Sequence, residues 1–247
     1  MAFLTSPEFW VALSQIILIN IVLSGDNAVV IALACRSLPD KQRTLGIWLG
    51  ATAAIGLRIV FALIVTYLLG VPFLKVVGGL LLFWIAIKLA VGEEGDHGNI
   101  QASDSLWKAV RTIAIADAVM SLDNVIAIAA ASRGHPELFI FGLLLSIPLI
   151  IMGAQFLTSI ITRFPILIWL GAALLGWIAA EMLIGDIAVM QWLQVNMPSW
   201  VVPAPLDVSP IGLKPAAMPH YVTSVLGALF VCVVGYVLKK RHASEVA

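Results

Sequence analysis

The chain has 247 residues, of which 61% are hydrophobic and 11% are charged, and its mean hydropathy is +1.04. Soluble domains carry about 45–50% apolar and about 25% charged residues, so the composition excludes an ordinary soluble domain and indicates a polytopic membrane protein. The 14 basic and 14 acidic residues balance to zero net charge, so the chain lacks the excess of basic residues that is typical of nucleic-acid-binding proteins.

Seven segments have the length and apolar character of membrane-spanning helices, which need about 20 predominantly apolar residues. The predicted spans cover residues 10–35, 44–70, 72–91, 107–132, 138–161, 165–186 and 220–238. The polar segment 93–105 separates the first three spans from the next three. The segment 189–219 contains six prolines, so we expect it to be too broken for a helix. Its tryptophans suggest a loop that lies along the membrane surface.

The distribution of lysine and arginine predicts the orientation of the chain. With the N-terminus outside, the cytoplasmic segments carry Arg36, Lys41, Arg43, Lys108, Arg111, Arg163, Lys239, Lys240 and Arg241, and the opposite side carries Lys75, Arg133 and Lys214. This excess of nine over three favours an N-out, C-in protein of the plasma or inner membrane.

The first three spans are repeated in the next three. Residues 20–39 align without a gap on residues 117–136, so that Asp26 meets Asp123 and Asn27 meets Asn124. Residues 72–92 align in the same way on 165–185, with identities that include Pro72 and Trp84. A unit with an odd number of spans must be inverted in its second copy, and inverted repeats are typical of secondary transporters.

We therefore predict an all-α polytopic membrane protein with seven transmembrane helices, made of two inverted three-helix repeats and a C-terminal seventh helix. The single transmembrane domain 1–247 comprises repeat 1 (8–92), a cytoplasmic loop (93–105), repeat 2 (106–188), an extracytoplasmic Pro- and Trp-containing loop (189–219), and helix 7 with a basic cytoplasmic tail (220–247).

Two aspartates interrupt apolar runs, Asp26 in LSGDNAVVIALA and Asp123 in SLDNVIAIAAA. A charged residue at the bilayer centre costs at least about 2.5–3.5 kcal/mol. Uncharged polar residues can hold helices together at a lower cost. We therefore expect the two aspartates to bind or gate a ligand, whereas Asn20, Ser24 and Ser121 could equally serve as helix-to-helix hydrogen-bonding groups.

The polar residues of each repeat share a helix face. Asn20, Ser24 and Asn27 follow the spacing of one face, and the second copy repeats it. Oxygen ligands suit hard divalent cations such as Mg²⁺, Ca²⁺ and Mn²⁺, and the lack of nearby His or Cys disfavours zinc and copper(I). The thioether of Met120 could favour Mn²⁺, although such a Met is more commonly part of a core. The candidate metal ligands are Asp26, Asn27, Asp117, Asp123 and Asn124, and the candidate supporting or gating residues are Asn20, Ser24, Arg58, Lys88, Met120, Ser121 and Glu181.

The span centres predict the depth of these groups. Asp26 is expected about 5 Å to the cytoplasmic side of its helix centre, and Asp123 as far to the outer side. Asp117 then joins the inner layer and Asn20 the outer layer, with the layers about 10 Å apart. A helix break at Gly25 would bring the two layers together.

Three further charged residues complete the predicted layers. Lys88 belongs to the inner layer, Glu181 to the outer layer, and Arg58 lies close to the midplane. An empty cation site must tolerate uncompensated carboxylates, so a nearby Lys or Arg can act as a counter-ion, or the carboxylates can take up protons. Either arrangement would support exchange of the metal for H⁺.

The paired motifs, in an inverted pair of three-helix units, resemble the TerC family of integral membrane proteins. The resemblance covers about residues 8–240, and the chain looks like a short member without appended soluble domains. It implies that Asp26, Asn27, Asp123 and Asn124 form a metal site and that manganese is the exported metal. The residues alone indicate only a hard divalent cation.

Two other functions remain open. An amino-acid or small-solute exporter would need cationic and anionic poles, which Lys88 and Glu181 could loosely provide. A membrane partner in the metalation of exported proteins could use the 189–219 loop as a docking surface. No HExxH or GxSxG motif is present, so we expect neither catalytic residues nor a resident cofactor. The expected partners are the divalent metal and the lipid bilayer, and the oligomeric state is left open.

Overall fold

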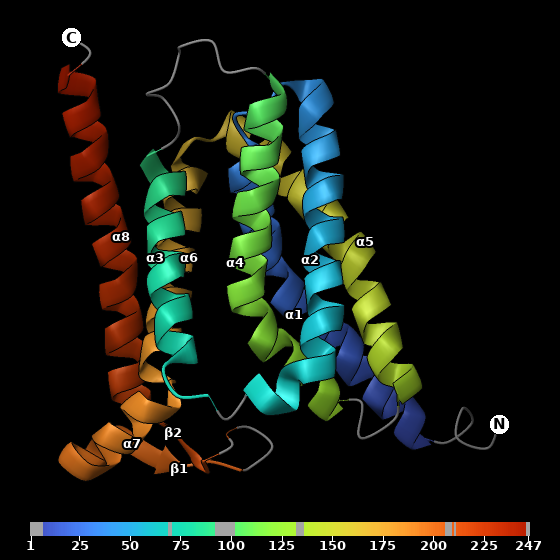
Figure 1. The fold of residues 1–247 in the computed structure, drawn as a ribbon, viewed down its shortest axis with the longest axis vertical. Coiled ribbons are helices and arrows are strands. Elements are labelled where there is room, and N and C mark those ends of the chain that lie inside the picture. The colour runs from blue at the N-terminus through green and yellow to red at the C-terminus, as the bar shows by residue number, and fades with distance from the viewer. Residues whose placement is uncertain are drawn as a thin grey trace. The chain divides into compact units, whose positions relative to one another are not determined.

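The structure is a computed structural model that describes residues 7–68, 71–91, 102–131, 136–205, 209 and 211–245. Within the helices it leaves out the side chains at 7–8, 12, 19–24, 62–68, 102–105, 122–131, 136–137, 139, 143 and 242–245. Its long helices are α1 (Pro7–Cys35), α2 (Asp40–Leu68), α3 (Leu74–Val91), α4 (Ala102–Ala131), α5 (Pro136–Arg163), α6 (Ile166–Ile184) and α8 (Ala217–Glu245). A short helix, α7 (Ile187–Asn196), and a 3₁₀ turn, η2 (Pro198–Trp200), precede a hairpin of β1 (Val201–Pro203) and β2 (Leu213–Pro215). The predicted all-α class is confirmed (Figure 1).

Five helical segments within the described residues are long and apolar enough to cross a membrane. They are Asp40–Phe61, Leu74–Val91, Ile140–Arg163, Ile166–Ile184 and Ala217–Arg241. Two shorter apolar stretches, Phe9–Leu18 and Gly25–Cys35, both lie in α1. The protein is therefore a multi-span helical membrane protein.

One expectation drawn from proline was wrong, and the helix break considered at Gly25 is not observed. Helix α1 runs without interruption through Gly25, because a single glycine weakens a helix by only about 1 kcal/mol. The segment 189–219 includes most of α7, so it is not too broken for a helix. Its prolines lie at position 198 and beyond, after the end of α7, where they cannot remove hydrogen bonds from that helix.

The described helices separate into two compact units. Unit 1 comprises Met1–Val65 and Ala102–Thr162, and unit 2 comprises Thr66–Gln101 and Arg163–Ala247. Unit 1 thus holds the first two spans of each predicted repeat, and unit 2 holds the third span of each together with α8. Each unit therefore contains corresponding helices of both predicted repeats. The inverted relation between the two repeats stays a prediction.

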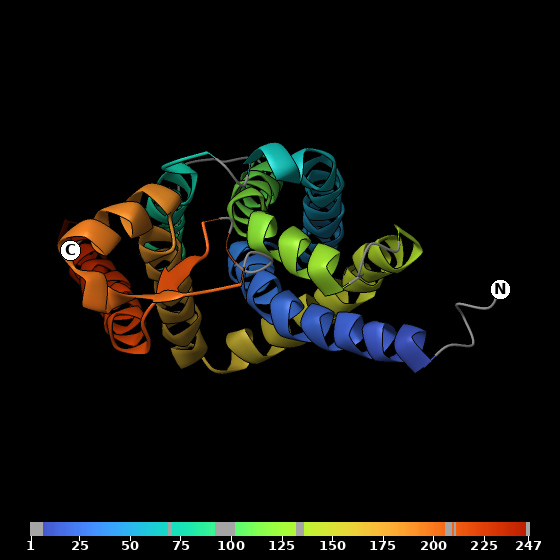
Figure 2. The same cartoon turned by 90° about the horizontal axis from the view of Figure 1, so that it is seen from below.

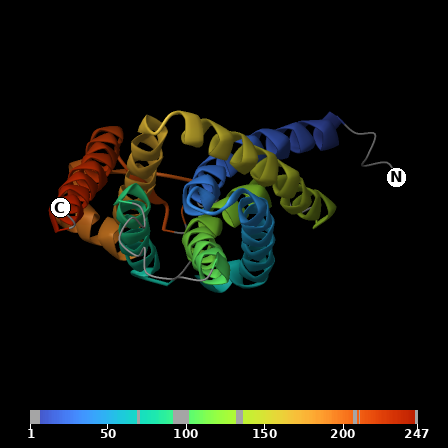
Figure 3. The same cartoon turned by 90° about the horizontal axis from the view of Figure 1, so that it is seen from above.

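In unit 1, helix α4 packs against both α1 and α2 (Figure 3). A Cβ atom on Gly50 of α2 would lie 2.5 Å from the Cδ1 of Ile113 in α4, and one on Gly153 of α5 would lie 3.1 Å from the Cβ of Ala28 in α1. These glycines allow the helix backbones to approach closely, as small residues do in membrane bundles. The close approach brings the polar residues of α1, α2 and α4 into one region.

In unit 2, helices α3, α6 and α8 pack against one another, and each contacts the other two (Figure 1). A Cβ atom on Gly227 of α8 would lie 2.4 Å from the carbonyl oxygen of Gly176 in α6. A Cβ on Gly79 of α3 would lie 2.7 Å from the carbonyl oxygen of Ala179. The three helices therefore pack through backbone surfaces that tolerate no side chain at the crossing points.

Asp186 joins the ends of α3, α6 and α7. Its buried carboxylate caps α7 by accepting a hydrogen bond from the backbone N–H of Ala188 at 2.9 Å. It also accepts bonds from the backbone N–H groups of Phe73 at 3.0 Å and Lys75 at 3.1 Å, at the start of α3. Phe73 has a positive φ of 63°, an uncommon conformation for a bulky residue, and the bond to Asp186 holds it in place.

Beyond α6 the chain turns and α7 runs crosswise to the long helices of unit 2 (Figure 2). Ile184, Met190 and Leu193 form a small buried core, against which Trp200 and Leu213 pack. The antiparallel register of the hairpin pairs Val202 with Lys214. This cap covers the ends of the helices in unit 2 with apolar side chains.

Candidate metal centre

A buried ion pair joins α2 to α4 inside unit 1. The Nη2 of Arg58 donates a hydrogen bond to the Oδ1 of Asp117 at 3.0 Å. The two side chains are 2% and 4% exposed, so neither charge is hydrated by bulk water. Each charge of this buried pair stabilises the other, because loss of one partner would leave the other buried without an opposite charge.

The second oxygen of Asp117 is also engaged. The Oγ of Ser121, one turn further along α4, donates to its Oδ2 at 2.6 Å. Ser121 is fully buried. The Nε of Arg58 is buried and has no hydrogen-bond partner among the described residues. The Nε–H group of Arg58 is therefore a further donor on the side chain that neutralises Asp117, and no described residue accepts from it.

Asp26 brings a second carboxylate to this region from α1. The charges of both Arg58 and Asp117 act on the Asp26 carboxylate. Its Oδ1 accepts hydrogen bonds from the backbone N–H of Asn27 at 2.7 Å and from the Nδ2 of Asn27 at 3.0 Å. Asn27 itself is buried. Arg58 therefore pairs directly with Asp117, and Asp26 lies within electrostatic reach of both groups.

The predicted inner layer stays a prediction. Asp26 and Asp117 were expected at a common depth, and the two carboxylates lie within electrostatic reach of each other. Met120 is buried, which is consistent with a core position. The side chains of Asn20, Ser24, Asp123 and Asn124 lie outside those that the structure describes, so the outer half of the predicted site stays a prediction.

The remaining two candidates, Lys88 and Glu181, belong to unit 2. The Nζ of Lys88 lies 5.6 Å from the ring centroid of Trp84, one turn earlier in α3. Glu181 accepts a hydrogen bond from the Nε1 of Trp177 at 2.6 Å, and its Oε1 is 3.2 Å from the Nε2 of His220. Each of the two therefore has local contacts within unit 2.

The described side chains do not form a complete metal site by themselves. Among the described residues, no three His, Cys, Asp or Glu side chains lie close enough together to hold a metal ion. The described part supplies two carboxylates and a serine hydroxyl, which are hard oxygen ligands. The second motif, Asp123 and Asn124, begins two residues after Ser121 in α4.

Two features of this chemistry were missed by the sequence reasoning. The direct pairing of Arg58 with Asp117 was not expected, because the two residues are 59 positions apart and lie in different predicted repeats. The capping role of Asp186 was not identified, although an Asp directly before an apolar helical run is a recognisable N-cap signal. Only the second feature had a signal in the sequence.

Comparison with known proteins agrees with the motifs. The model of the integral membrane protein TerC family matches residues 5–243. The chain belongs to the TerC family. It is 44% identical over 179 residues to the membrane protein YjbE of Bacillus subtilis (strain 168), covering 72% of this chain and 82% of YjbE. It is 29% identical over 188 residues to YceF of the same organism, covering 72% of this chain and 73% of YceF.

A more distant relative is longer than this TerC-family chain. The inner membrane protein YoaE of Escherichia coli (strain K12) is 26% identical over 184 residues, which cover 67% of this chain but 35% of YoaE. None of the three names states a substrate. No solved structure matches the chain. The family assignment and the helical segments together place the protein in a membrane.

Proposed function

We propose that this protein is a secondary transporter that exports a divalent metal cation, with manganese as the cargo, in exchange for H⁺. The observation that carries the proposal is the buried Arg58–Asp117 pair with Asp26 in electrostatic reach. Ionisable residues inside membrane helices are costly and mark ion pathways. Membership in the TerC family adds support for transport, and the hard oxygen ligands favour a hard cation over zinc.

The proposal assigns Arg58 the role of counter-ion in the empty state. A divalent cation that binds Asp26 and Asp117 brings the positive charge that Arg58 otherwise supplies. Arg58 would then release Asp117, and it would return after the cation leaves. Ser121 would keep the Asp117 carboxylate oriented in both states through its 2.6 Å hydrogen bond. The protein would thereby avoid a state with two uncompensated carboxylates in a dry bundle.

The wider architecture belongs to the same proposal. We infer seven spans in two inverted three-helix repeats and a seventh helix, with the N-terminus outside. The second motif, with Asp123 and Asn124, would then approach the site from the outer side. The grouping of corresponding helices in unit 1 supports this reading, because α1, α2, α4 and α5 are the first two spans of each predicted repeat.

Transport into inside-out membrane vesicles tests the proposal. Vesicles that contain the wild-type protein should take up radioactive manganese when a proton gradient is imposed. Asp26→Asn and Asp117→Asn should abolish this uptake, because each removes a charged oxygen ligand. Asp40→Asn is the matched control, since Asp40 is 92% exposed at the start of α2, and it should transport like the wild type. Wild-type rates in both site variants would overturn the proposal.

An amino-acid exporter is a second candidate, which one observation favours. Arg58 and Asp117 place a buried cation and a buried anion 3.0 Å apart, and such a pair could open to bind the two poles of a zwitterion. The same vesicles distinguish the two functions. If unlabelled amino acids inhibit manganese uptake and are themselves transported in an Asp117-dependent way, the zwitterion function replaces the metal function.

A further inference from the structure

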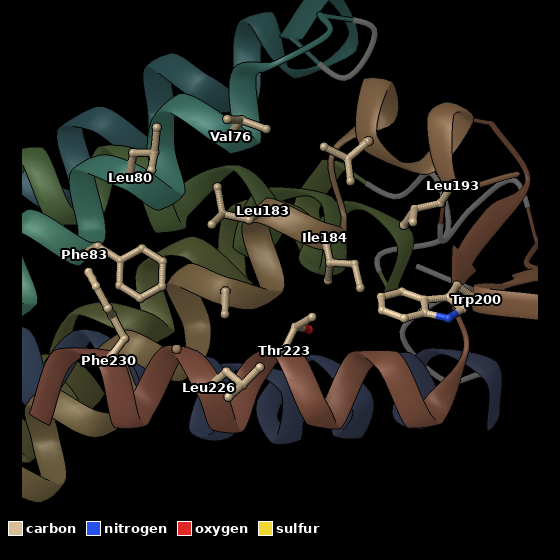
Figure 4. A pocket seen from close by; sticks show the side chains of 13 residues that line it. Val76, Leu80, Phe83, Leu183, Ile184, Leu193, Trp200, Thr223, Leu226 and Phe230 are labelled. Atoms are coloured by element: carbon tan, nitrogen blue, oxygen red, sulfur yellow. The ribbon is translucent and has the colours of Figure 1, made fainter. Parts of the chain in front are cut away.

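Unit 2 contains an apolar cavity of about 640 Å³ that is largely open to its surroundings. Ligand pockets in proteins commonly have volumes of about 300–1,000 Å³. The walls come from α3, α6 and α8, and one end is formed by α7 and Trp200 (Figure 4). The lining residues that matter for the argument are Val76, Phe83, Val189, Trp200, Thr223 and Phe230.

The chemistry of the lining favours an apolar ligand. Of the thirteen lining residues, only Thr223 and Trp200 carry polar side-chain atoms. The Oγ1 of Thr223 is already within hydrogen-bonding distance of two backbone carbonyl oxygens of its own helix, Pro219 at 2.8 Å and His220 at 3.0 Å. A polar ligand would lose its hydration there without finding partners. An alkyl chain has no such requirement.

The length and direction of the cavity match one leaflet of a bilayer. It extends from Trp200 and α7, where α3, α6 and α8 begin or end, to Phe83 and Phe230. These two rings pack edge to face with centroids 5.4 Å apart and line the far end (Figure 4). Phe83 lies nine residues beyond the start of α3, which is about 14 Å along a helix. The hydrocarbon core of a bilayer is about 30 Å thick, so the end at Phe83 and Phe230 lies near the midplane.

The end of the cavity at Trp200 has the polarity of a membrane interface. Trp200 sits at this end, and tryptophan is enriched at the level of the lipid headgroups. Lys75 directly precedes the lining residue Val76 in the first turn of α3, and Lys214 lies in β2. A lipid that enters with its chain toward Phe83 would therefore leave its phosphate on the side of the molecule that carries these lysines. This order is the one that a phospholipid adopts in the surrounding leaflet.

We propose that this cavity binds one acyl chain of a phospholipid from the leaflet that borders α7. The occupant is a lipid chain and not a helix of a partner protein, because the lining residues extend from Trp200 only as far as Phe83 and Phe230, about half of the bilayer depth. A spanning helix would need a groove across the whole bilayer, whereas a chain from a single leaflet needs only this length. The site stands apart from the proposed metal transport and does not depend on it.

Matched tryptophan substitutions on α3 test the site. Val76 lines the cavity, while its neighbour Val77 does not line it and is 59% exposed. The full-length wild type, Val76→Trp and Val77→Trp are purified in a mild detergent, and bound phospholipid per protein is measured by native mass spectrometry and phosphorus analysis. The wild type and Val77→Trp should retain one phospholipid, and Val76→Trp should show a several-fold loss. Equal retention in the two variants, or none in the wild type, would overturn the proposal.

A second measurement uses the unchanged protein, so a misfolded Val76→Trp variant cannot hide the answer. The wild type is reconstituted with a phospholipid that carries a photoreactive diazirine at the end of one acyl chain. Cross-links should concentrate on the peptides that contain Phe83 and Phe230, at the end of the cavity opposite Trp200. Cross-links that spread evenly over the exposed residues of α8, or covalent dimers of the protein in their place, would contradict the proposal. Val189→Trp, which fills the cavity from α7, should reduce the same cross-links.

Discussion

Removal of one partner of the Arg58–Asp117 pair should destabilise the protein strongly. In Asp117→Leu the Arg58 side chain, which is 2% exposed, would remain buried without an anion that pairs with it directly. Breaking a buried pair in this way typically costs about 3–5 kcal/mol. For a chain of this size, 1 kcal/mol shifts the melting temperature by about 2–4 °C, so the loss should reach roughly 6–20 °C.

The double variant is the decisive part of this experiment. Replacing both partners, in Arg58→Leu/Asp117→Leu, removes both buried charges and should recover most of the stability lost in either single variant. Thermal unfolding of the detergent-purified variants, followed by fluorescence-detected size-exclusion chromatography, measures all three. The exposed pair of Arg43 and Asp40 provides the control, since its aspartate is 92% exposed and such pairs contribute about 0–1 kcal/mol. Strictly additive losses in the double variant would refute the argument that the two charges compensate each other.

Two further predictions concern the packing of unit 2. Gly227→Val should lower the unfolding free energy by about 1–3 kcal/mol or more, because its Cβ would lie 2.4 Å from the carbonyl oxygen of Gly176. Gly56→Ala, which meets nothing within 4 Å, should be neutral or slightly stabilising in the same thermal assay, and equal effects of the two would contradict the close-packing argument. Asp186→Ala should cost about 1–3 kcal/mol, because buried N–H groups at the starts of α3 and α7 lose their acceptor. Hydrogen exchange should then accelerate at the first turns of both helices, while protection in unit 1 stays unchanged.

The sequence was sufficient for the membrane class and for the positions of the helices. Continuous apolar runs of about 20 residues allow only spanning helices, because every backbone N–H and C=O in lipid must be bonded within its own segment. The predicted spans therefore overlap the observed long helices, for example 165–186 with Ile166–Ile184. The same reasoning failed for α7, which is too short for that rule and depends on its cap at Asp186.

The sequence identified residues of the candidate site but not which of them pair with each other. Asp26 and Asp117 stand out in the sequence because a charge within an apolar run is costly. A common depth for the two was predicted by counting residues along each helix. The partner of Asp117 could not be found in this way, because Arg58 reaches it from another helix, and rotation of one helix against another depends on side-chain packing.

The amino-acid sequence alone determined that this protein is a helical membrane protein, which residues carry the buried charges, and to which family it belongs. Only the tertiary structure decided that Arg58 neutralises Asp117, and that glycine contacts draw α3, α6 and α8 together around an apolar cavity. The reason lies in the range of the interactions. Hydropathy and spacing act within one helix, whereas ion pairs and cavities depend on how close different helices approach and on which faces they turn toward each other.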